Sequence, residues 1–175
     1  MANRQALREL QTRLAERLQA ARTQAVQGAS WLAVQAGGRN YLLPLEQAGE
    51  IFSWSGVLRV PYTSAWFWGV ANLRGNLAGV VDLCAYLGHP VERTEQALQA
   101  VSLLAINPAL QVNVALVVDR LLGLRGKDDF MAPTAEAVPL AAGHPDSYVD
   151  KAGGTWQVLQ LQQLVQHPAF LSIRI

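Results

Sequence analysis

The pattern of hydrophobic and polar positions divides the chain into an N-terminal arm and a longer body. Within the first 28 residues, one apolar stripe recurs at helical spacing, formed by Leu7, Leu10, Leu14 and Leu18. From residue 29 onwards, short runs rich in Val, Leu, Ile and Trp alternate with Gly, Asn and Pro. We therefore predict an amphipathic helical arm over 1–28, which docks on the protein's own body or on a partner, and a mainly β domain over 29–175.

The short apolar runs predict β-strands in two series. The first series comprises 31–36, 40–45, 49–53, 57–60, 70–73 and 76–82, and the second comprises 100–106, 112–118, 121–125 and 155–161. Many short strands with turn residues between them are typical of small barrels or sandwiches. The polar stretch 88–99 is predicted to connect the two series. The stretch 126–154, rich in Ala, Pro, Gly and Asp, is predicted to be a long irregular connection.

The two series resemble each other. Residues 41–51 match 114–124 as apolar runs closed by an acid, Glu46 or Asp119. Residues 75–87 match 153–165, because each begins with glycine, continues with paired aliphatic residues and ends in a leucine-bearing helical turn. This similarity predicts a pseudo-repeat of two β-barrels.

Composition restricts the function. Charged residues make up 15% of the 175, well below the roughly 25% of ordinary soluble chains, which leaves apolar surface for a partner. The net charge of +1 argues against a protein that grips polyanions. One cysteine allows no internal disulfide, and no apolar run approaches the length of a membrane span. We therefore expect a soluble cytoplasmic protein with no direct membrane insertion.

Residues that could carry chemistry are scattered. His89, His144 and His167 lie far apart, and none has a metal-ligand partner at helical or hairpin spacing. Cys84 falls in the predicted helical turn "LCAYLG", where a buried free thiol is the ordinary interpretation. We expect no enzyme, cofactor or metal. Two alternatives stay open, a small hydrolase with an unrecognised site and a nucleic-acid-binding β-barrel module.

The stretch 69–83, "GVANLRGNLAGVVDL", places one arginine between two strand-like runs. The planar fork of Arg74 can bond several carbonyls or a carboxylate at once. Gly75 supplies backbone freedom beside it, and Asn72 can bond the neighbouring main chain. Arg74 therefore either latches the hairpin alone or also shapes a surface for a partner.

The sequence "GVANLRGNLAGVVDLCAYLG", preceded by "NYLLPLEQAGEIF" and "VLRVP", resembles the CheW-like domain of bacterial chemosensory adaptors. The resemblance runs from about Trp31 to Val165. The leucine-bearing arm, "WFWGVANLRG" and "QHPAFL" look like the adaptor of the type IV pilus, twitching-motility branch. The resemblance to the CheW-like domain implies two five-stranded SH3-like β-barrels in pseudo-symmetric arrangement. It also implies a non-enzymatic coupler at receptor arrays near the inner membrane.

The resemblance further implies the partners and their contact residues. The partners are the cytoplasmic tip of a methyl-accepting chemoreceptor and the regulatory domain of a CheA-type histidine kinase, with no nucleic acid. A receptor groove between the barrels is expected at or above Ala48, Glu50, Ile51, Val70, Asn72, Leu73 and Arg74. A kinase surface is expected at Phe52, Trp54 and Val57, where Trp54 and Val57 are either exposed or core. Trp68 is a candidate exposed contact, and Gly69, Gly75 and Asp82 are expected to be structural.

Overall fold

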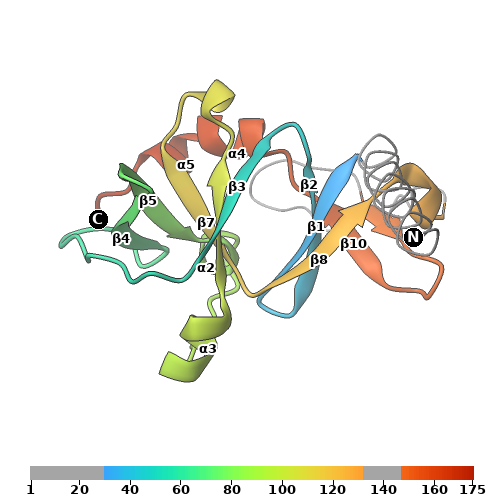
Figure 1. The fold of residues 1–175 in the computed structure, drawn as a ribbon, viewed down its shortest axis with the longest axis horizontal. Helices are drawn as coiled ribbons and strands as arrows, with labels where there is room; N and C mark the ends of the chain where they lie inside the picture. Colours follow the sequence, from blue (N-terminus) through green and yellow to red (C-terminus); the bar gives the residue numbers. More distant parts are fainter. Residues whose placement is uncertain (1–29, 132–146) are drawn as a thin grey trace, which may run out of the picture.

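The computed structural model describes residues 30–131 and 147–175, and two five-stranded sheets lie side by side in it (Figure 1). The predicted arm over 1–28 lies outside the described residues. No helix in the described ranges is long and apolar enough to span a membrane. The strands are β1 (Trp31–Ala36), β2 (Arg39–Pro44), β3 (Ala48–Ser53), β4 (Phe67–Leu73), β5 (Asn76–Asp82), β6 (Ser102–Ile106), β7 (Val114–Val118), β8 (Arg120–Arg125), β9 (Ser147–Val149) and β10 (Thr155–Val158). The helices are α2 (Leu83–Tyr86), α3 (Glu95–Ala100), α4 (Leu161–Gln166) and α5 (Pro168–Leu171), with short 3-10 turns at Pro108–Leu110 and Lys127–Asp129.

Both halves of the chain contribute to each sheet. Sheet A has the strand order β8-β1-β2-β10-β9, and sheet B has the order β3-β6-β7-β5-β4. The pairs β2–β10 and β5–β7 are parallel, and the other neighbours are antiparallel. The chain therefore crosses from sheet A to sheet B between β2 and β3, and returns between β7 and β8. The sequence pattern did not predict this exchange of strands.

The internal repeat predicted from the sequence is confirmed by this topology. The segment β2–β3 corresponds to β7–β8, and β5 with α2 corresponds to β10 with α4. The ladders also break at equivalent points. Strand β3 carries an extra residue between Ala48 and Ile51, and β8 carries one between Leu121 and Gly123. Such bulges bend each strand just after the chain has crossed from the other sheet.

The central strands β1, β2, β6 and β7 are buried on both faces, which explains their continuous apolar runs. Alternate residues of β1, β2, β6 and β7 pack into one large core between the sheets, which includes Leu32, Val34, Leu43, Leu104 and Leu116. The intervening residues of these strands help to form two smaller cores. The core of sheet B includes Leu103 and Val117, and the core of sheet A includes Leu42 and Trp156. Helices α2, α4 and α5 add buried residues to the core between the sheets.

Two local predictions were wrong. The run 57–60 is not a strand, because only Leu58 forms a bridge, to Val70, and Pro61 follows with no N–H to donate. The connection 126–154 was expected to be irregular, but it contains β9 at its end and a bridge between Phe130 and Asp150. The Leu58–Val70 bridge links the segment after β3 to β4, the two edge strands of sheet B. The Phe130–Asp150 bridge links the segments that follow β8 and β9, the two edge strands of sheet A, so it is the equivalent contact in the other half of the repeat.

Candidate partner-binding site

The hairpin between β4 and β5 holds Arg74 in an exposed turn. Leu73 pairs with Asn76, so the turn consists of Arg74 and Gly75, and their φ angles are 51° and 87°. Two positive φ values in a two-residue hairpin define a type I′ turn, for which Asn-Gly is the preferred pair. Asn72 Oδ1 accepts a hydrogen bond from Gly75 N at 2.7 Å. The turn geometry therefore does not favour an arginine at its first position, although one stands there.

The side chain of Arg74 reaches back to β3. Its guanidinium forms an ion pair with the carboxylate of Glu50 and lies 5.6 Å from the ring centre of Phe52. The Arg74 side chain is 74% exposed and that of Glu50 is 47% exposed. The pair adjoins a groove of about 390 Å³, the hairpin groove, which Glu50, Phe52, Leu73 and Ile106 help to line. An exposed guanidinium beside an apolar groove can bond a carboxylate or carbonyl of a partner.

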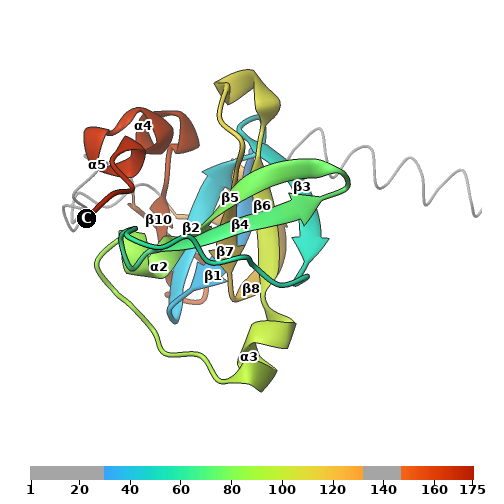
Figure 2. The same cartoon turned by 90° about the vertical axis from the view of Figure 1, so that its left-hand side faces the viewer.

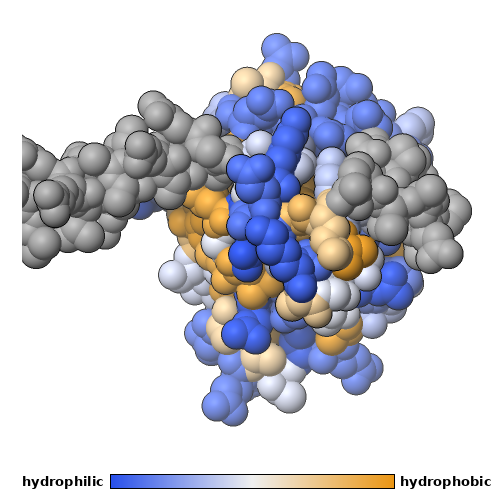
Figure 3. Space-filling view, turned by 90° about the vertical axis from the view of Figure 1, so that its right-hand side faces the viewer, coloured by the Kyte–Doolittle hydropathy of each residue, from blue (hydrophilic) through white to orange (hydrophobic). Residues whose placement is uncertain are grey.

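A second depression lies at the other end of β4. Trp54 and Trp68 meet edge to face, with ring centres 5.8 Å apart and planes at 85°. We call it the aromatic hollow; its volume is about 250 Å³, and it is lined by Trp54, Val57, Arg59, Trp68, Arg93 and Leu98. Sheet B faces the viewer in Figure 2, with sheet A behind it. Seen from the opposite end, sheet A shows small hydrophobic patches separated by hydrophilic side chains (Figure 3).

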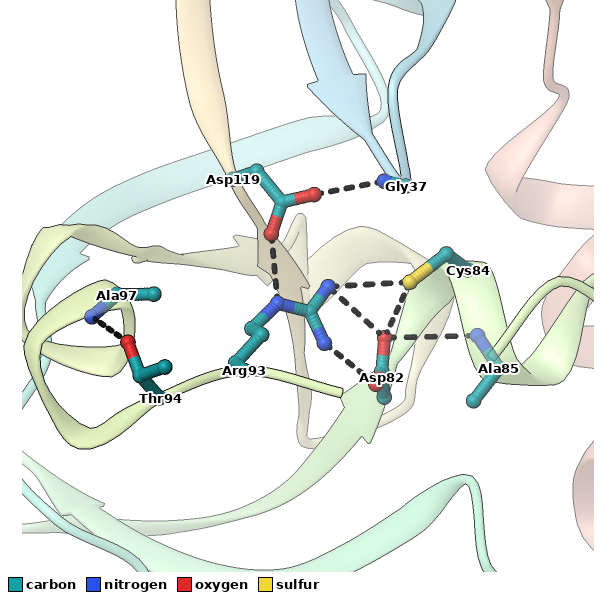
Figure 4. Close-up of polar contacts among 8 residues, drawn as sticks. All are labelled: Gly37, Asp82, Cys84, Ala85, Arg93, Thr94, Ala97 and Asp119. Atoms are coloured by element: carbon teal, nitrogen blue, oxygen red, sulfur yellow. Dashed lines mark hydrogen bonds and ion pairs between the residues drawn. The ribbon is translucent and has the colours of Figure 1, made fainter. Parts of the chain in front are cut away.

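Beneath the aromatic hollow, Arg93 joins several segments (Figure 4). Its Nη1 donates to Asp82 Oδ2 at 2.8 Å, its Nε donates to Asp119 Oδ1 at 2.7 Å, and its Nη2 lies 3.0 Å from Cys84 Sγ. Asp119 also accepts a hydrogen bond from Gly37 N at 2.6 Å. Asp119 is the single residue between β7 and β8, and Gly37 lies between β1 and β2. The cluster therefore ties the connection 88–99 to both sheets where the chain crosses between them.

In this cluster one buried guanidinium meets two carboxylates. The side chain of Arg93 is 5% exposed and that of Asp82 is 3% exposed. Burial alone would lower the pKa of Arg93, but hydrogen bonds from Arg93 to Asp119 and Asp82 outweigh it, so the pKa is raised above its ordinary value. Burial and the hydrogen bond to Asp82 raise the pKa of Cys84 to about 11. The Cys84 thiol therefore stays protonated at neutral pH and is not a nucleophile.

Gly69 allows β4 to approach the segment that follows β3. Its φ is 131°, and a Cβ added there would lie 2.0 Å from the carbonyl oxygen of Leu58. The bridge between Leu58 and Val70 depends on this close approach. Asp82, at the end of β5, caps α2 by accepting a hydrogen bond from Ala85 N.

Gly69→Ala should lower the free energy of unfolding by about 2 kcal/mol more than Gly75→Ala, because the added methyl group must displace backbone. Gly75→Ala is the matched control, since Gly75 also has a positive φ but a Cβ there meets nothing within 4 Å. Urea denaturation followed by circular dichroism measures both. Equal losses in the two variants would contradict the close approach described for Gly69.

Comparison with known proteins identifies the fold. A family model described as the CheW-like domain matches residues 30–169, which is most of the chain. The chain belongs to the CheW-like domain family. The CheW-like domain is a non-enzymatic scaffold, so the small-hydrolase alternative falls. In the described ranges, no group of three or more His, Cys, Asp or Glu side chains is arranged to hold a metal ion.

The CheW-like chain is similar to one described protein in sequence and to one solved structure in fold. It is 29% identical over 162 residues to Protein PilI of Pseudomonas aeruginosa, which covers 89% of this chain and 85% of that protein. It also resembles the crystal structure of the scaffolding protein TtCheW from Thermoanaerobacter tengcongensis, with a TM-score of 0.62 and 15% identity. That match covers 77% of this chain and 92% of the other, and it shows a shared fold.

The structure divides the seven residues expected in the receptor groove of this CheW-like domain. Ala48 packs against the core between the sheets, where the resemblance placed the groove. Glu50 and Leu73 line the hairpin groove on sheet B, beside Arg74. The other three belong to the same two strands but do not line that groove; they are Ile51, Val70 and Asn72. The hairpin groove thus brings together three of the seven, which are Glu50, Leu73 and Arg74.

The residues expected at the kinase surface are partly covered. Phe52, Trp54 and Val57 pack against the core inside sheet B and are half-buried. Trp54 and Val57 also line the aromatic hollow, whereas Phe52 lines the hairpin groove. Trp68 is half-buried as well, because both Trp54 and Arg93 lie against it. These side chains pack on the core of sheet B and leave only part of their surface accessible to a partner.

Sequence reasoning missed Arg93 and Leu98. Both lie in the connection 88–99, whose polar composition indicated only a crossing between strand series. One signal was present, since Arg93 is the only Lys or Arg in that stretch. Its partners Asp82 and Asp119 could not be assigned to it, because the exchange of strands that brings them together was not predicted.

Proposed function

We propose that the protein is a cytoplasmic adaptor that couples methyl-accepting chemoreceptors to a CheA-type histidine kinase in arrays near the inner membrane. It would bind the cytoplasmic tip of the receptor and the regulatory domain of the kinase. The match of residues 30–169 to the CheW-like domain is the observation that carries this proposal. The similarity to PilI supports a chemosensory system that controls type IV pili and twitching motility.

Two surfaces of sheet B are the proposed contact sites. For the receptor, we propose the hairpin groove and its surroundings, with Ala48, Glu50, Ile51, Val70, Asn72, Leu73 and Arg74. For the kinase, we propose Phe52, Trp54 and Val57, with Trp68 as a further contact. The chemistry of both suits protein partners, because interface cores favour aromatic and aliphatic side chains, with arginine the preferred charged residue. Gly69, Gly75 and Asp82 would hold the strands that carry these surfaces.

A pull-down tests the proposal directly. The immobilised protein should retain the regulatory domain of the organism's CheA-type kinase and, separately, a cytoplasmic fragment of its methyl-accepting receptor. An unrelated SH3-like barrel of similar size is the control for non-specific retention. Retention of neither partner above that control would overturn the adaptor function.

A further inference from the structure

The aromatic hollow has the size of a site for one side chain. Its volume of about 250 Å³ lies below the roughly 300–1,000 Å³ of sites for small molecules. Trp54 and Trp68 meet edge to face at it, and Val57 and Leu98 complete the apolar part of its lining. Aromatic and aliphatic walls of this kind receive a bulky apolar group from a partner.

Helix α3 forms one wall of this hollow without contributing to any core. It projects from the body in both ribbon views (Figures 1 and 2). It has no buried residue, and Leu98 is its only half-buried one. Leu98 packs in none of the three core clusters of the described residues. Packing within the chain therefore does not explain a leucine at this position, but a docking wall does.

Of the two arginines that line the hollow, only Arg59 has no carboxylate partner among the residues the structure describes. The charge of Arg93 is matched by Asp82 and Asp119. Arg59 is exposed, forms no ion pair among the residues the structure describes, and no carboxylate lines the hollow with it. A fitting partner therefore carries a carboxylate next to its apolar side chain, because complementary charges set the register of a docking contact.

We infer that the aromatic hollow receives one bulky apolar side chain from the kinase regulatory domain, and that Arg59 pairs with a neighbouring carboxylate of that domain. This inference rests on the proposed function and adds to it the chemistry of the docking element. It also gives α3, Leu98 and Arg59 a role. Arg93, which also lines the hollow, is a positioning residue here, since its guanidinium lies 5.5 Å from the ring centre of Trp68.

Leu98→Ala tests the apolar part of the site. Because Leu98 belongs to no core, the variant should keep the thermal midpoint of the native protein and bind the kinase regulatory domain about tenfold more weakly in calorimetric titration. Gln99→Ala is the matched control on the same helix, and its affinity should equal that of the native protein. An unchanged affinity of Leu98→Ala for a kinase domain that the native protein binds would overturn the inference.

Arg59→Glu tests the charged part. Its affinity for the same domain should fall at least tenfold at about 0.05 M salt, and the difference should shrink as salt screens the contact. Arg59→Lys should retain most of the affinity, and Lys151→Glu, an equal charge change in the β9–β10 turn, should have no effect. Equal losses of affinity in Arg59→Glu and Lys151→Glu would show that only the net charge of the protein matters, and would overturn the proposed pairing of Arg59 with a carboxylate. Failure of the native protein to bind would instead defeat the proposed function itself.

Discussion

Replacing Arg93 with methionine should lower the free energy of unfolding by about 3–5 kcal/mol, the cost of leaving a buried charge without its partner. Methionine fills a similar volume, so the loss reports charge rather than a cavity. Asp82, whose side chain is 3% exposed, loses its main cationic partner, while the more exposed Asp119 keeps the hydrogen bond from Gly37 N. Urea denaturation monitored by far-UV circular dichroism measures the change.

Two further variants separate the buried ion pair from a general loss of arginine. Arg59→Met removes an exposed arginine that forms no ion pair in the described part of the chain, and it should change stability by less than about 0.5 kcal/mol. The double variant Asp82→Asn/Arg93→Met leaves no unpaired carboxylate at position 82. Its loss in the free energy of unfolding should therefore be smaller than the sum of the two single losses by at least about 1 kcal/mol. Strict additivity would contradict the coupling seen in Figure 4.

Arg74→Asn should leave stability within about 1 kcal/mol of the native value and weaken binding of the receptor fragment by about thirtyfold or more. Asparagine suits the first position of a type I′ turn, which offsets the lost ion pair. That pair is exposed on both sides and contributes only about 0–1 kcal/mol. A central arginine of an interface can contribute about 2 kcal/mol or more to binding, and asparagine has no guanidinium to replace it.

This variant decides between the two roles that the sequence left open for Arg74. Binding is measured by calorimetric titration with the receptor fragment, and stability by urea denaturation of the same preparation. Arg74→Lys is the matched control, since it keeps the charge but loses the planar fork. Its affinity should lie between that of the native protein and that of Arg74→Asn. A loss of stability above about 2 kcal/mol with unchanged affinity would show that Arg74 only holds the hairpin.

The strands and their repeat could be predicted because their signals are local. Short apolar runs bounded by turn residues mark β1, β2 and β5 closely, and the shared pattern of 41–51 and 114–124 reveals the internal repeat. The assignment of strands to sheets could not be predicted in the same way. It depends on pairing between segments far apart in the chain, such as β3 with β6 and β8 with β1, and periodicity does not record which sheet a strand joins.

The candidate site was predictable where it lies in one short motif. The turn at Arg74 and its hydrogen bond from Gly75 to Asn72 involve neighbouring residues, so spacing was enough to suggest them. The pairing of Arg74 with Glu50 joins two strands that are not neighbours in sheet B, and only the structure shows it. The exposure of Trp54 was likewise undecided, because its cover is Trp68 from β4.

The most direct test of the adaptor function is a three-component binding measurement. A cytoplasmic receptor fragment is fixed to beads, and retention of the kinase regulatory domain is measured with and without this protein. The account predicts that kinase retention rises with added protein to a saturating level, and that the Arg74→Asn variant supports far less of it. Equal retention with and without the protein, or release of the protein from the beads whenever the kinase domain is added, would contradict it.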